Sequence, residues 1–207
     1  MTTAKLFYVM GASGVGKDSL LDYARKYSTA NDGYVFAHRY ITRPANSGGE
    51  NHIALTKEEF QQRVQHHCFV MSWQSHGNGY GIGSEINQWL QQGLNVVVNG
   101  SRAYFNTAIE KYPSMVPVLI TADNHHLLAR LTKRGRESQE DIEKRVQTNE
   151  SIERIVKHPS LVIIENNSEL AVAGNAFIKL LKSIDRTTSP LFQQLNKEAE
   201  VSLKKCN

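Results

Sequence analysis

The chain has 207 residues, 40% of them hydrophobic, which is long enough for one compact α/β domain and short for two. Its formal net charge is only +4, from 24 Lys and Arg against 20 Asp and Glu. The basic residues lie among glycines and polar turns without interleaved aromatic residues, which favours an arginine-lined pocket for phosphorylated ligands over a nucleic-acid surface. We therefore expect no nucleic-acid partner.

The cysteines and the apolar runs bear on the compartment in which the protein works. Cys68 and Cys206 lie far apart in the sequence, as expected for free thiols in a reducing environment. The start of the chain shows no signal peptide, and no apolar run approaches the roughly 20 residues of a membrane helix. These features predict a cytoplasmic protein that does not cross a membrane.

A glycine-rich loop near the start of the chain is the most informative stretch. It follows the apolar run 6–10, which predicts a buried strand, and precedes 20–25, which predicts a helix. This is the context of a P-loop, whose backbone N–H groups surround triphosphate oxygens at a helix N-terminus. A glycine-rich turn that binds nothing is the minor alternative. The residues predicted to bind ATP are Gly11, Ala12, Ser13, Gly14, Val15, Gly16, Lys17, Asp18 and Ser19.

Asp18 departs from the P-loop pattern, because the residue after the lysine is usually Ser or Thr. A carboxylate beside a bound triphosphate is repulsive unless a cation lies between the two. We therefore hypothesise that Asp18 and Ser19 hold Mg²⁺, directly or through water. The alternative is that Asp18 only interacts favourably with the dipole of the helix whose first turn it occupies.

The stretch after the P-loop helix predicts short strands and one well-marked helix. Residues 34–37 begin an extended run that ends at Arg43-Pro44, where the proline imposes extended geometry on the arginine. Residues 45–49 predict a flexible loop, followed by the short apolar run 53–55. Thr56 to Glu59 is a capping box, which predicts a helix that continues to about His66.

The middle of the chain predicts alternating strands and helices. Residues 69–73 predict a strand, and the glycine-rich stretch 77–83 predicts a mobile turn around Tyr80. A helix over 84–92 is expected to stop at Gly93. The next strand, 94–98, ends in the polar residues 99–102, at the position where open α/β sheets bind ligands.

The last part of the chain predicts the end of the sheet and a lid. The expected elements are a strand at 116–120, a helix at 124–133, a charged helix at 139–155, a strand at 161–164 and a closing helix at 170–184. An arginine-glycine corner joins the first two of these helices, which predicts a lid over about 125–155. We expect one kinase domain over 1–185 and a tail over 186–207.

A P-loop indicates a nucleoside triphosphate but does not say where its γ-phosphate goes. The chain has no Asn-Lys-x-Asp stretch, which argues against a GTPase switch protein. The strand 94–98 ends at Asn99 instead of an acid, which argues against an ATPase motor. The remaining class is a small P-loop kinase: an α/β fold with a mostly parallel sheet flanked by helices, an arginine-bearing acceptor segment and a helical lid.

Several motifs occur in the order expected of one kinase family. They are Thr42-Arg43-Pro44, Gly49-Glu50, Tyr80-Gly81, and the lid residues Arg130, Arg134-Gly135, Asp141-Ile142 and Lys144-Arg145. With these motifs, the chain from Leu6 to about Leu181 resembles the guanylate kinase-like group of P-loop kinases. The blocks 16–19, 37–44, 49–55 and 99–102 are similar to a branch of that group. Its members use ATP to convert ribose 1,5-bisphosphate to 5-phosphoribosyl 1-diphosphate in bacterial phosphonate breakdown.

The departures from guanylate kinase lie on the acceptor side of the reaction. Ser72 stands where the family has an acid that forms hydrogen bonds with guanine. The loss of such a charge-assisted hydrogen bond costs about 1.5–3 kcal/mol, which argues against GMP as the acceptor. His52 stands near the family's phosphate-binding tyrosine, and Ala45 and Asn46 replace a second arginine. The family's Asp-x-Asp at a strand end is Val98-Asn99-Gly100 here. The resemblance therefore implies that the phosphate donor is the same as in guanylate kinase, ATP with Mg²⁺, and that the phosphate acceptor is different.

The site residues follow partly from chemistry and partly from the resemblance. Guanidinium forks bind phosphate bidentately, so three arginines are candidates for the acceptor's phosphates, and the resemblance adds four neighbours. The predicted substrate-binding residues are Arg39, Arg43, Glu50, His52, Tyr80, Asn99 and Arg102. The predicted catalytic residues are Lys17, Arg130, Arg134 and Arg145, with Arg136 as a further ATP-binding residue. A phosphate acceptor is already ionised, so we predict no general base.

Simpler roles stay open for several of these residues. Arg145 is nearly as well explained as a surface salt-bridge partner, Arg102 as a helix cap and Tyr80 as core packing. Glu50 could orient arginines, and His52 could only mimic the shape of a tyrosine. For the whole chain the alternatives are a nucleoside monophosphate kinase such as guanylate kinase, and a non-catalytic interaction module. The expected partners are ATP and a phosphorylated sugar, and the sequence leaves a homodimer open.

Overall fold

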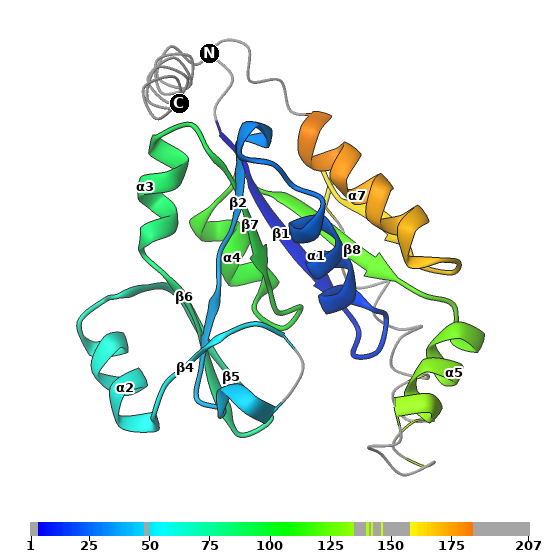
Figure 1. Cartoon of the computed structure of the whole chain (residues 1–207). Helices are drawn as coiled ribbons and strands as arrows, with labels where there is room; N and C mark the ends of the chain where they lie inside the picture. Colours follow the sequence, from blue (N-terminus) through cyan, green and yellow to red (C-terminus); the bar gives the residue numbers. More distant parts are fainter. Residues whose placement is uncertain are drawn as a thin grey trace, which may run out of the picture. The chain divides into compact units, whose positions relative to one another are not determined.

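The computed structural model describes residues 4–47, 50–134, 140, 142, 146 and 158–183 (Figure 1). The chain divides into two compact units that alternate along the sequence. One comprises Phe7–Tyr27 and Asn99–Lys179 and is called the P-loop unit below. The other comprises Met1–Leu6, Ser28–Val98 and Leu180–Asn207 and is called the hairpin unit.

The P-loop unit contains three parallel strands in the order β1-β8-β9. They are β1 (Leu6–Gly11), β8 (Val116–Thr121) and β9 (Val162–Glu165), and in their register Val9 pairs with Val118 and Ile120 with Ile164. The helices of this unit with described bounds are α1 (Lys17–Lys26), α4 (Phe105–Lys111), α5 (Asn124–Arg134) and most of α7 (Leu170–Ser183) (Figure 1). Parallel pairing brings the carboxyl ends of the strands to one edge of the sheet.

Burial in β1 and α1 explains why these elements form. The five apolar residues 6–10 are all buried, as expected of a parallel strand whose two faces are both covered. In α1, Leu20, Leu21 and Ala24 form the buried stripe of an amphipathic helix. The P-loop between them is therefore anchored at both ends by apolar packing.

The hairpin unit contains one parallel strand pair and one four-stranded sheet. β2 (Tyr34–Phe36) pairs in parallel with β7 (Asn95–Asn99). The other sheet has the order β4-β3-β6-β5, made by Ile53–Ala54, Arg39–Ile41, Asn78–Gly83 and Phe69–Ser75. β3 pairs in parallel with β4, and the other pairs are antiparallel. The helices here are α2 (Lys57–Gln65) and α3 (Glu85–Gln91), with 3₁₀ turns η1 (Ala30–Asp32) and η2 (Ala45–Ser47).

The prediction of a mobile turn at 77–83 is wrong for all but Gly77, because residues 78–83 form strand β6, which is largely buried. The glycines serve packing: a Cβ on Gly79 would come within 2.8 Å of the Phe60 ring, and one on Gly81 within 2.8 Å of the Phe69 ring. The turn itself lies one step earlier, at His76 and Gly77, with φ values of 47° and 74°. Tyr80 is therefore a fixed strand residue.

The structure differs from other local predictions at the start of α2, at residues 45–47 and at α4. Thr56 caps α2 by accepting from the Glu59 N–H at 3.0 Å, but the Glu59 carboxylate pairs with Arg63 instead of closing the capping box. Residues 45–47 form η2 within the predicted flexible loop, and α4 is a helix that the sequence analysis did not predict. The predicted corner at 135–137, most of the charged helix 139–155 and the tail 186–207 lie outside the described residues.

Two further expectations concern the cysteines and the membrane. Cys68 is an exposed free thiol, and Cys206 lies outside the described residues. Of the helices that the structure describes, none combines the length and the hydropathy that crossing a membrane requires.

Candidate active site

The P-loop joins β1 to α1 through two left-handed glycines. Gly14 has φ 93° and Gly16, the residue before α1, has φ 87°. L-residues with side chains rarely adopt this conformation, so glycine is required at both positions. The turn places Lys17 and Asp18 in the first turn of α1, where backbone N–H groups lack intrahelical partners and favour anions.

The backbone of the P-loop is held by side chains from distant parts of the chain. The Val15 carbonyl accepts from Asn166 Nδ2 at 2.8 Å and from Arg130 Nη1 at 3.2 Å. Arg130 Nη2 also donates to the Asn166 carbonyl at 2.8 Å. These bonds orient the loop, so in this structure Arg130 acts on the P-loop through its backbone.

Asn166 is a site residue that the sequence analysis missed. It is only 3% exposed and follows β9 directly, where its N–H donates to the Thr121 carbonyl. Its position in the sequence, directly after a predicted strand, could have indicated this role, because polar residues at the carboxyl ends of parallel strands lie at the ligand-binding edge. The sequence analysis used that signal for Asn99 but not for Asn166.

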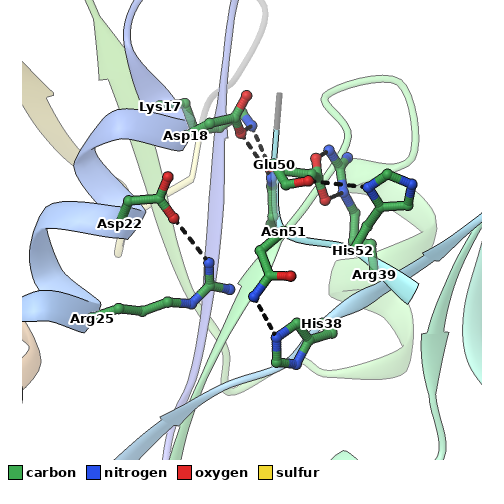
Figure 2. Close-up of polar contacts among 10 residues, drawn as sticks. Lys17, Asp18, Asp22, Arg25, His38, Arg39, Glu50, Asn51 and His52 are labelled. Carbon is green, nitrogen blue, oxygen red and sulfur yellow. Dashed lines mark hydrogen bonds and ion pairs between the residues drawn. The ribbon is translucent and has the colours of Figure 1, made fainter. Parts of the chain in front are cut away.

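Lys17, Asp18 and Asn99 form a polar cluster within the P-loop unit. Lys17 Nζ donates to Asp18 Oδ1 at 2.8 Å and to Asn99 Oδ1 at 2.5 Å. Asn99 Nδ2 donates to Asp18 Oδ1 at 3.0 Å. Figure 2 shows Lys17 and Asp18 side by side on α1. Asn99 was predicted to bind the acceptor, and in the structure it contacts the two charged residues of the P-loop.

Arg102 lies in the loop that follows β7. Tyr8 fixes this loop, because its hydroxyl donates to the Ser101 carbonyl at 2.7 Å and accepts from the Ser101 N–H at 2.9 Å. Burial lowers the pKa of the Arg102 guanidinium, and its Nη1 is buried without a hydrogen-bond partner among the described residues. A buried cation with an unpaired donor is costly, and an anion would relieve that cost.

Arg39 and Glu50 form a two-bond ion pair in the hairpin unit. Arg39 Nε donates to Glu50 Oε1 at 2.6 Å, and Arg39 Nη2 pairs with Glu50 Oε2 (Figure 2). The Arg39 guanidinium also lies 5.0 Å from the centre of the Tyr80 ring, which stacks on Trp73. Glu50 thus orients Arg39, as the sequence analysis left open, and Tyr80 is 9% exposed within this stack.

His52 and Arg43 belong to the same segment of the hairpin unit. His52 is 8% exposed, and its two ring nitrogens each lie 3.0 Å from a backbone carbonyl, Nδ1 from that of Glu50 and Nε2 from that of Arg43. His52 therefore fixes the backbone that carries Arg43. The Arg43 guanidinium has two buried N–H groups, on Nε and Nη2, without a partner among the described residues. Of the two residues, Arg43 is the one with unused donors for an anion.

The family is shown by comparison with known proteins. A family model described as guanylate kinase matches residues 3–177. The chain belongs to the guanylate kinase family. A solved guanylate kinase from Anaplasma phagocytophilum shares the fold, with a TM-score of 0.61 over 92% of this chain and 90% of that one, at 14% identity. The predicted α/β P-loop kinase fold is confirmed.

More similar relatives within this family carry another name. A protein of Psychromonas ingrahamii named ribose 1,5-bisphosphate phosphokinase PhnN is 58% identical over 179 residues, covering 86% of this chain and 90% of its own length. A Desulfomicrobium baculatum protein of the same name is 49% identical, covering 86% of this chain and 94% of its own. The resemblance to the ribose 1,5-bisphosphate branch, predicted from short blocks, therefore extends over most of the chain.

Some predicted site residues of this guanylate kinase family member cannot be placed. Arg136 and Arg145 lie outside the described residues. Arg134 is the last residue of α5, and its side chain is outside the description as well. Ser19 is exposed on the first turn of α1, one residue after Asp18.

Proposed function

We propose that this chain transfers the γ-phosphate of ATP to the 1-phosphate of ribose 1,5-bisphosphate, giving 5-phosphoribosyl 1-diphosphate and ADP. The observation that carries this proposal is the name shared by relatives that are 58% and 49% identical over most of the chain. The intact P-loop supports a triphosphate donor, because Gly14, Gly16 and Lys17 all have the required conformation or position. It also disfavours a non-catalytic interaction module.

The residues of the P-loop unit would bind and activate the donor. The backbone N–H groups of residues 11–19 surround phosphate oxygens, and Lys17 reaches the β- and γ-phosphates. Arg130 holds the loop in shape through the Val15 carbonyl. Arg134, Arg136 and Arg145 remain our candidates for the groups that neutralise charge on the γ-phosphoryl group during transfer.

The donor atoms around Lys17 fit a magnesium ion bound together with ATP. Mg²⁺ prefers one or two carboxylates plus phosphate oxygens to a cage made of protein ligands alone. The structure offers the Asp18 carboxylate next to the hydroxyl-bearing Ser19, and the described residues contain no cluster of three or more His, Cys, Asp or Glu suited to a metal. When bound, the ion would supply positive charge that offsets the negative charge of the triphosphate.

The arginines with unused donors would bind the acceptor. Arg43 has two buried N–H groups without partners and Arg102 has one, all within the described part of the chain. A phosphate at either residue would gain charge-assisted hydrogen bonds. The other predicted acceptor residues, Arg39, Glu50, His52 and Tyr80, would position this segment through their contacts with one another.

Guanylate kinase is the second candidate, favoured by the family match and by the solved neighbour. Against it stands Ser72 on β5, at the position expected to hold the guanine-reading acid, since a neutral hydroxyl can accept only an uncharged, weaker hydrogen bond than a carboxylate. Turnover on a panel that includes ribose 1,5-bisphosphate and GMP, with ATP and Mg²⁺, separates the two. We expect the sugar bisphosphate to be phosphorylated. Phosphorylation of GMP alone would contradict the proposal.

The setting of this reaction also remains a proposal. A cytoplasmic location suits an enzyme that uses ATP, and phosphonate breakdown is the process that the relatives' branch serves. A homodimer stays open, and the measurement that decides it is the mass of the purified protein in solution.

A further inference from the structure

The cluster of Lys17, Asp18 and Asn99 contains one carboxylate, one ammonium group and one amide. The Asn99 amide forms a hydrogen bond with each charged group: its Oδ1 accepts from Lys17 and its Nδ2 donates to Asp18. Asn99 is 5% exposed, so contacts within the protein and not solvent set this orientation. The three side chains therefore fix one another at the entrance to α1.

Asn99 and Asp18 exchange the positions at which P-loop proteins usually carry a polar uncharged residue and an acid. In P-loop NTPases the residue after the lysine is Ser or Thr, which binds Mg²⁺ through its hydroxyl, and an acid at the end of a strand supplies the carboxylate. Here the loop residue is the acid and the strand-end residue is the amide. Within the P-loop unit, Gly100, the residue after Asn99, is held to the backbone of Val9, because its N–H donates to the Val9 carbonyl at 2.8 Å.

Charge explains why the two changes occur together. Asn99 Nδ2 lies 3.0 Å from Asp18 Oδ1, so an acid at position 99 would place a second carboxylate oxygen against the first. Two carboxylates at that distance repel, and one of them would take up a proton. Conversely, Ser at position 18 with Asn at position 99 would leave the cluster without a carboxylate. Each residue is therefore suited to the other and poorly suited to the usual partner.

The Lys17 ammonium shows that this place accepts a cation. Its Nζ lies between two oxygens from different parts of the chain, Asp18 Oδ1 at 2.8 Å and Asn99 Oδ1 at 2.5 Å. In a P-loop with bound triphosphate the lysine is directed to the β- and γ-phosphates. The Asp18 carboxylate then lies close to the negatively charged triphosphate and repels it unless a cation lies between the two.

We propose that Asp18 supplies from the P-loop the metal-binding carboxylate that a strand end supplies in other P-loop proteins. Asn99 is a positioning residue that orients this carboxylate by donating to Oδ1. The proposal rests on the proposed use of ATP with Mg²⁺, and it extends it by assigning Asp18 and Asn99 as a transposed pair. It predicts that moving the carboxylate back to position 99 compensates for its loss at position 18.

The test is a calorimetric measurement of ATP binding to the full chain, without any acceptor, in excess Mg²⁺ and in EDTA. The ratio of the two dissociation constants is compared for the wild type, Asp18→Ser, Asn99→Asp and the double variant Asp18→Ser/Asn99→Asp. Asp18→Asn removes the charge with little change of shape. Asp22→Ser is the matched control, because Asp22 lies one turn later on α1 and pairs with Arg25.

We expect Asp18→Ser and Asp18→Asn to lose about tenfold or more of the Mg²⁺ enhancement, because even the loss of a residue that only supports a metal ligand costs roughly 10- to 100-fold. Asn99→Asp should weaken ATP binding through repulsion, whereas the double variant should regain most of the enhancement. The control should behave as the wild type.

An unchanged Mg²⁺ enhancement in Asp18→Asn would overturn the proposal, as would a double variant no better than Asp18→Ser. If the wild type bound no ATP in either condition, the proposed function would fail and this proposal with it. If the wild type binds ATP but turns over no ribose 1,5-bisphosphate, only the acceptor assignment fails.

Discussion

Lys17 and Arg43 are both partly buried cations, but the protein surrounds them in different ways. Lys17 has its own counter-charge, Asp18, and an amide oxygen from Asn99. Arg43 has a backbone fixed by His52 but two guanidinium N–H groups without partners among the described residues. The first arrangement is a cluster that a ligand must rearrange, and the second is a set of donors that a ligand completes. The contrast suggests that ATP with its metal exchanges partners at Lys17, whereas the acceptor phosphate adds partners at Arg43.

The strongest test of this contrast removes the lysine. Lys17→Met should lower kcat by about 10²–10³, the usual cost of losing a group that stabilises developing charge. Lys26→Met is the control, because Lys26 ends the same helix and lies over the Tyr27 ring. Steady-state kinetics measure both variants. Normal turnover in Lys17→Met would show that the cluster is structural only.

The next test removes the unpaired donors. Arg43→Met should raise the KM for ribose 1,5-bisphosphate by about 10- to 150-fold, equivalent to the loss of about 1.5–3 kcal/mol of charge-assisted hydrogen bonding. The KM for ATP should stay unchanged. Arg25→Met, which removes an arginine paired with Asp22 on α1, provides the comparison. Equal increases in both KM values would contradict a role confined to the acceptor.

A smaller effect is expected from the strand that supports the acceptor segment. Gly81→Ala should destabilise the protein by about 1–3 kcal/mol, because the new Cβ would meet the Phe69 ring at 2.8 Å in a packed core. Thermal unfolding should shift downward by roughly 2–4 °C per kcal/mol. Gly77→Asn serves as the control, since nothing lies within 4 Å of that position and Asn tolerates its positive φ. An unchanged melting temperature for Gly81→Ala would indicate a pliable hairpin.

The smallest effect is expected for an ion pair that includes neither the residues around Lys17 nor those around Arg43. Lys182 Nζ lies 2.8 Å from Asp32 Oδ1; burial by itself would raise the pKa of Asp32, but hydrogen bonds from Lys182 and Thr29 outweigh it and lower that pKa below its ordinary 3.8. The stabilisation is therefore complete above that pH and is lost as the pH falls through the lowered value.

Lys182→Met should cost about 0.2–1 kcal/mol near neutral pH, because Lys182 is half-exposed. The difference from the wild type should disappear in acid. Denaturant unfolding as a function of pH measures it, with Lys179→Met, an exposed lysine on the same helix, as the control. A difference that persists well below the ordinary carboxyl pKa would exclude the ion pair as its source.

The sequence by itself determined the P-loop, most of the helices and strands, and the kinase family. These features depend on local patterns: glycines at fixed spacing, apolar runs, and helix caps such as Thr56. It also named Arg43 as a candidate anion-binding residue, because the planar guanidinium fork matches the geometry of phosphate.

Only the tertiary structure decided which of these side chains act together. The glycines of β6 predicted a turn because the pattern cannot show that the rings of Phe60 and Phe69 pack against them. Asn166 holds Val15 from 151 residues away, and Asn99 meets Asp18 across 81. Such contacts are set by the order and register of parallel strands, which bring distant strand ends to one edge of a sheet. Local sequence patterns do not show which distant residues come together, so the contact between Asp18 and Asn99 is seen only in the folded chain.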